Sequence, residues 1–253
     1  MIEVPLISTA DGRPTHDLAA IAEAFETGAS LLVLVNPHNP TGRVFEGNEL
    51  AALADVVVRY RGRVFADEIH APITFPGHRH HPYAAVSTMT AAHTATATSA
   101  SKAWNLAGVK AAQLVWADPH LAKRWSQVGT WSEHVTSTLG VVAHLAAYEA
   151  GLPWLEEVLR YLDGNRKMVA EALDGTGIRN REPEGTYLAW LDFRNLPQTQ
   201  PNPAVWLRER AGVALNEGSD WGSAGIGFAR LTLATPRPIL KEILNRIRGA
   251  VAC

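Results

Sequence analysis

The sequence predicts an α/β fold: a large domain with a mixed, mostly parallel sheet in a three-layer αβα arrangement, and a smaller C-terminal α+β domain. Short apolar runs alternate with helical patterns along the first half of the chain, a rhythm typical of parallel strands joined by helices. Residues 31–35 are apolar throughout, as in a strand that is covered on both faces. Because Gly151-Leu152-Pro153 interrupts the pattern, we expect domains at residues 1–150 and 151–253.

The elements of the large domain follow from periodicity and turn residues. Apolar residues recur at helical spacing in residues 17–27, and this helix is expected to end near Gly28. Threonine and alanine alternate up to Thr98, as in a strand. We expect strands at residues 3–7, 31–35, 63–66, 93–98 and 113–116, helices at residues 17–27 and 46–60, and a mostly helical stretch at 119–150 with a break near Gly129.

The small domain combines long helices with few strands. An amphipathic pattern predicts a long helix at residues 154–173. The other expected elements are strands at residues 186–192 and 228–234, and helices at residues 203–211 and 237–251. This order of elements indicates an α+β arrangement.

Composition excludes several classes of protein. The chain has 253 residues, of which 47% are hydrophobic, so it can bury a sizeable core. A net charge of -2 gives no electrostatic footprint for nucleic acid or an anionic membrane. The single cysteine, Cys253, excludes an internal disulfide framework. Since no apolar run could span a bilayer and the N-terminus lacks a signal-peptide pattern, we expect a cytoplasmic protein.

Three polar stretches follow separate predicted strands, and they carry the functional prediction. They are Asn36-Pro37-His38-Asn39-Pro40-Thr41-Gly42, Asp67-Glu68-Ile69-His70 and Ser99-Ala100-Ser101-Lys102. In open α/β sheets, ligands bind at the carboxyl ends of the strands. Taken alone, these stretches could be a proline-rich turn, a helix N-cap and a loop with a surface lysine. Their convergence favours one ligand site that contains Asn39, Asp67 and Lys102.

Three histidines close together in the sequence suggest a metal site: His78, His80 and His81. No partner ligands stand at metal-binding spacing. We therefore interpret this segment as a solvated loop and expect no metal site.

Together the three stretches resemble the aspartate aminotransferase superfamily of pyridoxal-phosphate (PLP) enzymes, fold type I. The resemblance implies that the amine of Lys102 bonds to the cofactor's aldehyde and is the catalytic group. It implies that Asp67 keeps the pyridine nitrogen protonated and that Asn39 donates to the phenolic oxygen. Ser99 and Lys110 match positions that bind the cofactor phosphate, although many relatives carry arginine in place of Lys110.

The form of two motifs points to one branch of this superfamily. Asp-Glu-Ile-His, with His70 among the cofactor-binding positions, and Asn-Pro-His-Asn-Pro-Thr-Gly-Arg resemble the MalY/PatB group of cystathionine β-lyase-like C–S lyases. Residues 185–192 also resemble this group. The implied reaction is an α,β-elimination that gives pyruvate, ammonia and a thiol, in a homodimer that acts on a small amino acid. An aminotransferase would use the same residues and is the alternative.

Near the C-terminus, residues 227–234 resemble the strand that carries the family's substrate-binding arginine. A guanidinium holds a carboxylate through a bidentate pair of hydrogen bonds, which lysine cannot reproduce. Arg230 is therefore the candidate for the substrate carboxylate, with an ordinary pair to a surface acid as the alternative.

The resemblance covers nearly the whole chain, but the chain covers only part of the family. It begins where relatives are about a third complete, so we expect the N-terminal arm, the phosphate loop and the aromatic that stacks on the cofactor to be missing. A non-catalytic remnant of such an enzyme is the second alternative.

Overall fold

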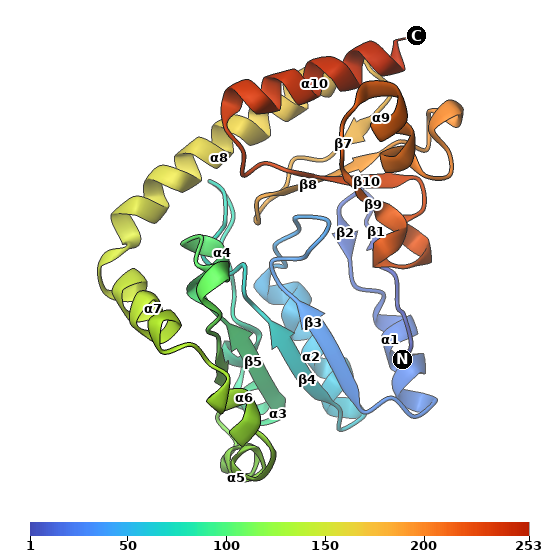
Figure 1. The fold of residues 1–253 in the computed structure, drawn as a ribbon. Helices are drawn as coiled ribbons and strands as arrows, with labels where there is room; N and C mark the ends of the chain where they lie inside the picture. The colour runs from blue at the N-terminus through green and yellow to red at the C-terminus, as the bar shows by residue number, and fades with distance from the viewer. Residues whose placement is uncertain (253) are drawn as a thin grey trace. The chain divides into compact units, whose positions relative to one another are not determined.

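The computed structural model describes residues 1–252 and divides into two compact units (Figure 1). The first unit contains residues 1–37 and 44–157, and the second contains residues 38–43 together with the chain from Val158 onward. The loop at residues 38–43 thus belongs by its contacts to the second unit. Cys253 lies outside the described residues. The division into functional domains at residues 1–150 and 151–253 stays a prediction.

The first unit alternates strands and helices, as expected. Its elements are β1 (Ile7–Ser8), β2 (Pro14–Thr15), α1 (Leu18–Glu26), β3 (Leu31–Val35), α2 (Gly47–Arg59), β4 (Arg63–Asp67), α3 (Thr88–His93), β5 (Thr94–Thr98), α4 (Ala100–Ala103), β6 (Gln113–Val115), α5 (Pro119–Val128), α6 (Thr130–His134) and α7 (Thr138–Ala150). Helix α8 (Leu152–Leu173) continues into the second unit. The expected break near Gly129 separates α5 from α6.

The expected strand at residues 3–7 is wrong. Only Ile7 and Ser8 form a strand, which pairs antiparallel with Pro14 and Thr15. Val4 and Leu6 instead pack their side chains against the hydrophobic core. Pro5 stands between them and has no N–H to donate to a neighbouring strand. The burial of Val4 and Leu6 therefore comes from side-chain packing and not from a strand.

The central sheet of the first unit has the order β3-β4-β5-β6. The first three strands are parallel and β6 is antiparallel to β5, which confirms the predicted mixed, mostly parallel sheet. Register aligns the carboxyl ends of the parallel strands, because Val35 pairs with Asp67 and Asp67 pairs with Ala97.

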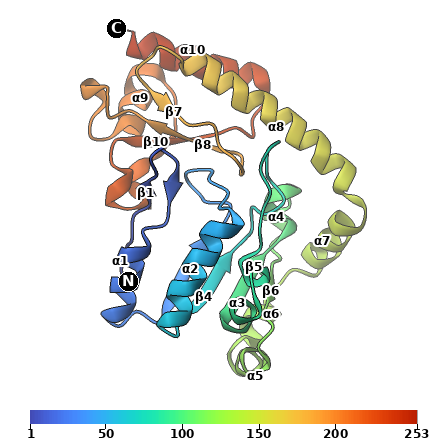
Figure 2. The ribbon, with the colours of Figure 1, turned by 180° about the vertical axis from the view of Figure 1, so that it is seen from behind.

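Helices α1 and α2 cover one face of this sheet. Helix α2 lies behind the sheet in Figure 1 and in front of it in Figure 2. It begins with a capping box between Glu46 and Glu49, which satisfies backbone N–H groups of its first turn. The core between the layers consists of fully buried or nearly buried side chains: Ile21, Phe25, Leu34, Phe45, Leu50, Leu53, Ala54, Val57, Val64, Ala66 and Tyr83.

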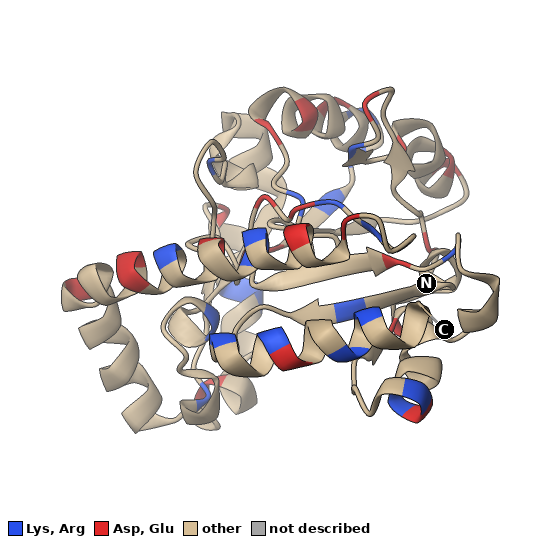
Figure 3. Ribbon diagram, turned by 90° about the horizontal axis from the view of Figure 1, so that it is seen from above, with Lys and Arg blue, Asp and Glu red and all other residues tan. Residues whose placement is uncertain are grey.

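The second unit is an antiparallel sheet of order β7-β8-β10-β9 with helices. Its remaining elements are β7 (Arg179–Asn180), β8 (Leu188–Asp192), α9 (Pro203–Ala211), β9 (Asn216–Glu217), β10 (Phe228–Thr232) and α10 (Arg237–Val251). Charges of both signs follow the long helices (Figure 3), with pairs such as Lys167–Asp163 and Arg246–Glu242 one helical turn apart. The predicted α+β character is confirmed.

No helix within residues 1–252 is long and apolar enough to cross a membrane.

The core on α2 gives a matched test of the packing. Val57 is fully buried, whereas its neighbour Val58 is 37% exposed on the same helix. We expect Val57→Ala to lower the free energy of unfolding by about 2 kcal/mol, because two buried methyl groups are lost and a cavity remains. Val58→Ala should change it by less than about 0.5 kcal/mol. Urea denaturation measures both, and equal effects would contradict the packing of α2 on the sheet.

Candidate functional site

The carboxyl ends of β4 and β5 place two predicted residues at one edge of the sheet. Asp67 is the last residue of β4, and its Oδ1 accepts a hydrogen bond from the N–H of Ile69 at 3.2 Å. Its Oδ2 has no hydrogen-bond partner within residues 1–252. Strand β5 ends at Thr98 and leads into α4, which carries Lys102. Asp67 and Ala97 are register partners. The carboxylate of Asp67 and the helix that carries Lys102 therefore follow the sheet at the same edge.

Ser99 caps α4 and is almost fully buried, at 1% exposure. Its Oγ accepts from the N–H of Ser101 at 3.0 Å and lies 2.8 Å from the carbonyl oxygen of Ala111. It also lies 2.9 Å from Nε2 of His144, a buried residue of α7. Sequence reasoning missed His144, because nothing in its local pattern distinguishes it from an ordinary residue of a helix.

Lys110 lies near the same edge of the sheet, because it precedes strand β6, which runs antiparallel to β5. It follows the turn after α4 and adopts a left-handed backbone conformation, with φ of 51°. Three residues later Gln113 begins β6 and pairs with Thr98, the last residue of β5. The side chain of Lys110 is exposed.

His70 is 4% exposed, in the turn after β4, and its carbonyl accepts from the N–H of Ile73 at 2.8 Å. Just before it, the buried carboxylate of Glu68 accepts from the N–H of Tyr83 at 2.8 Å and lies 3.1 Å from Nε2 of His80. The interpretation of the histidine segment as a solvated loop is therefore wrong for His80, whose side chain is 11% exposed. Within residues 1–252, no group of three or more candidate ligands could hold a metal ion.

The remaining predicted residues, Asn39 and Arg230, lie in the second unit and contact each other. Nη1 of Arg230 donates to Oδ1 of Asn39 at 2.7 Å, and Nη2 donates to Oδ1 of Asn216 at 3.0 Å. The guanidinium lies 4.2 Å from the ring centroid of Trp221, a cation–π contact. Within residues 1–252, Arg230 has no carboxylate partner. Asn216 and Trp221 were not predicted, because only the folded chain brings them to β10.

Burial governs the electrostatics around Arg230. It lowers the pKa of the guanidinium, while Tyr187 and Asp220 act in the opposite direction. Burial also raises the pKa of Tyr187, and the nearby charge of Arg230 partly offsets that rise. Since an arginine is protonated far above neutral pH, the cluster holds a positive charge under ordinary conditions.

The loop that carries Asn39 is anchored within the second unit. Gly42 has φ of 71°, and a Cβ there would lie 2.3 Å from the side chain of Pro183, so only glycine fits. The carbonyl of Gly42 accepts from the N–H groups of Glu184 and Gly185, each at 2.9 Å. Arg43 and Glu184 form a buried ion pair beside it. These contacts hold Asn39 in place for Arg230.

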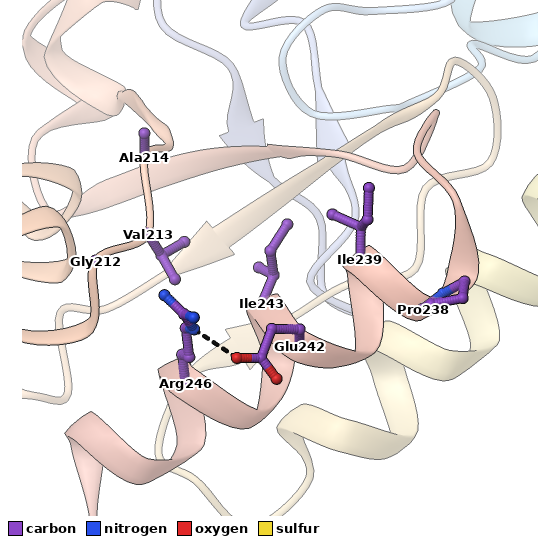
Figure 4. A pocket seen from close by; sticks show the side chains of 8 residues that line it. All are labelled: Gly212, Val213, Ala214, Pro238, Ile239, Glu242, Ile243 and Arg246. Atoms are coloured by element: carbon purple, nitrogen blue, oxygen red, sulfur yellow. Dashed lines mark hydrogen bonds and ion pairs between the residues drawn. The ribbon is translucent and has the colours of Figure 1, made fainter.

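Asp67, His70, Ser99, Lys102 and Lys110 thus lie after β4 and β5 in the first unit, and Asn39 contacts Arg230 in the second. A separate hollow of about 480 Å³ lies between α10 and the segment after α9 (Figure 4). Its charged lining residues, Arg246 and Glu242, pair with each other along α10. None of the predicted site residues lines this hollow.

Comparison with known proteins identifies the family. Residues 3–247 match the family model described as aminotransferase class I and II. The chain is 38% identical to cystathionine β-lyase of Corynebacterium glutamicum over 93% of its length. It is similar to the crystal structure of the PLP-bound C–S lyase from Staphylococcus hominis, with a TM-score of 0.90, 31% identity and 99% of the chain covered. It is also similar to N-succinyldiaminopimelate aminotransferase of Mycobacterium tuberculosis, with a TM-score of 0.87, 26% identity and 98% coverage.

The chain belongs to the class I and II aminotransferase family, as predicted. Its fold is that of the PLP-dependent proteins it matches. The chain spans 63% of the length of the Corynebacterium enzyme, 66% of the Staphylococcus chain and 65% of the Mycobacterium chain.

Two substitutions of Asp67 test whether its side chain stabilises the turn after β4. Asparagine retains an oxygen that can accept from Ile69, whereas alanine does not. We expect Asp67→Ala to lower the free energy of unfolding by about 1 kcal/mol, and Asp67→Asn to lower it by less than half as much. Urea denaturation measures the two side by side. If both variants lost the same stability, the hydrogen bond to Ile69 would not explain the turn.

Proposed function

We propose that this chain acts as a PLP-dependent C–S β-lyase, which cleaves an amino acid such as cystathionine to pyruvate, ammonia and a thiol. The observation that carries the proposal is the parallel register that brings Asp67 and the Lys102 helix to one sheet edge. Similarity to proteins named cystathionine β-lyase and C–S lyase supports this choice of reaction.

The donor set at the sheet edge fits PLP. The carboxylate of Asp67 has an oxygen without a partner within residues 1–252, which suits a protonated ring nitrogen. The amine of Lys102 is half-buried and has no ion-pair partner in the same part of the chain, so it can bond to an aldehyde. Ser99 and Lys110 offer a hydroxyl and a positive charge for the phosphate.

When bound, PLP supplies an electron sink for the bond-breaking step. Lys102 would take the Cα proton of the substrate on its Nζ, and Asp67 would keep the ring nitrogen protonated. Arg230 would hold the substrate carboxylate through its guanidinium. Because Oδ1 of Asn39 accepts from Arg230, the amide N–H groups of Asn39 are directed elsewhere and can donate to the phenolic oxygen.

Two alternatives follow from specific observations. An aminotransferase is the first, because proteins of that activity are among the structural relatives and would use the same lysine to return the proton. A protein without catalysis is the second, because the chain spans less than two thirds of the length of the Corynebacterium relative. The homodimer and the cytoplasmic location remain predictions.

The absorption spectrum of the 253-residue chain with added PLP tests cofactor binding. We expect a visible band that needs Lys102 and is absent in Lys102→Ala, because no other amine replaces it. Asp67→Asn should keep the fold and weaken the band's response to substrate. A wild-type chain that folds cooperatively but gives no band would contradict the proposal.

Product analysis separates the two reactions. With cystathionine as substrate, we expect release of pyruvate and thiol, and little amino transfer to an added keto acid. Arg230→Lys should raise KM about 10- to 100-fold, since a bidentate charged hydrogen bond is lost. Dominant keto-acid-dependent transfer would instead favour the aminotransferase.

A further inference from the structure

His144 is a buried histidine that the proposed reaction does not use. It is 1% exposed and projects from α7. Its Nδ1 lies 2.8 Å from the carbonyl oxygen of Gly140, and its Nε2 lies 2.9 Å from Oγ of Ser99. It therefore contacts a residue that we place at the cofactor phosphate.

The contacts of Ser99 restrict the direction of its hydroxyl. Its Oγ accepts from the N–H of Ser101, and the carbonyl oxygen of Ala111 and Nε2 of His144 lie within hydrogen-bond distance. If Nε2 of His144 donates to Oγ, the single hydroxyl proton remains for the carbonyl of Ala111 or for a phosphate.

Helix α7 is fixed against the lysine loop, so this contact is not incidental. The indole N–H of Trp104 donates to the carbonyl of Gly151 at 2.9 Å, and its ring meets Tyr148 edge to face. Gly140 lies so close to the turn that a Cβ would be 2.4 Å from the carbonyl oxygen of Val109. The position of His144 relative to Ser99 is therefore set by packing along α7.

The surroundings of His144 suit an anion at Ser99. On its own helix the ring of Tyr148 packs edge-on against the imidazole, while Glu149 is exposed. The elements packed against α7 carry Lys102, on α4, and Lys110, just after the turn. These two lysines would attract a phosphate.

We propose that His144 is a positioning residue of the phosphate-binding part of the site, because it restricts the direction in which the Ser99 hydroxyl can donate to a phosphate. The proposal rests on the proposed function, since it concerns the cofactor's phosphate. His144 acts on the phosphate only through its contact with Oγ of Ser99.

The first test compares PLP affinity, measured by titration of the visible band, for wild type, His144→Leu, His144→Gln and Ser99→Ala. We expect the dissociation constant to rise about 10-fold in His144→Leu, as for the loss of one hydrogen bond. Glutamine keeps a polar nitrogen near the position of Nε2 and should restore part of the affinity. Adding Ser99→Ala should cause less loss in His144→Leu than in the wild type, because His144 acts through the Ser99 side chain.

Nitrogen NMR of the histidine-labelled chain without PLP tests the contact itself. Ser99→Ala should shift the His144 Nε2 resonance, which His144→Gln identifies by its absence. An unshifted resonance, or unchanged PLP affinity in His144→Leu beside a normal wild-type band, would overturn the role of His144 and leave the lyase proposal intact. A wild type without the band would contradict the proposed function itself, and the role of His144 at its phosphate would fall with it.

Discussion

The register of three parallel strands is the constraint on which the site depends. Val35, Asp67 and Ala97 stand at the same level of the sheet, so the chain leaves β3, β4 and β5 at one edge. Packing enforces this level, because Val64 and Ala66 face the core while Asp67 stands at the end of the strand. A slip of one residue would turn the core side chains of β4 to the opposite face. Core burial thus positions the carboxylate.

Local contacts orient the predicted polar groups within each unit. In the first unit, Ser99 caps α4 and is held by α7 through His144, which limits where the Lys102 helix can lie. In the second unit, the tight approach of Gly42 to Pro183 holds the loop of Asn39, and Arg230 then fixes the orientation of its amide. In both units, the predicted polar group is oriented by a neighbour that would take no direct part in bond breaking.

The sequence predicts those candidate site residues that stand next to a recognisable strand or motif. Lys102, Asp67 and Asn39 each follow a recognisable strand, and residues 237–251 show the helical period that becomes α10. The contacts that orient them join residues far apart in the chain, such as Ser99 with His144 and Arg230 with Asn39, and no local pattern encodes them. The strand expected at residues 3–7 is wrong because apolar side chains such as Val4 and Leu6 can be buried without a neighbouring strand.

The most direct measurement of the central claim is to reduce the PLP-treated chain with borohydride and map the modified peptide by mass spectrometry. We expect one cofactor group per chain, attached to Lys102, with Lys110 unmodified because its place is at the phosphate. A label spread over exposed lysines, or concentrated on Lys110, would contradict the assignment of Lys102 as the catalytic amine and with it the proposed lyase chemistry.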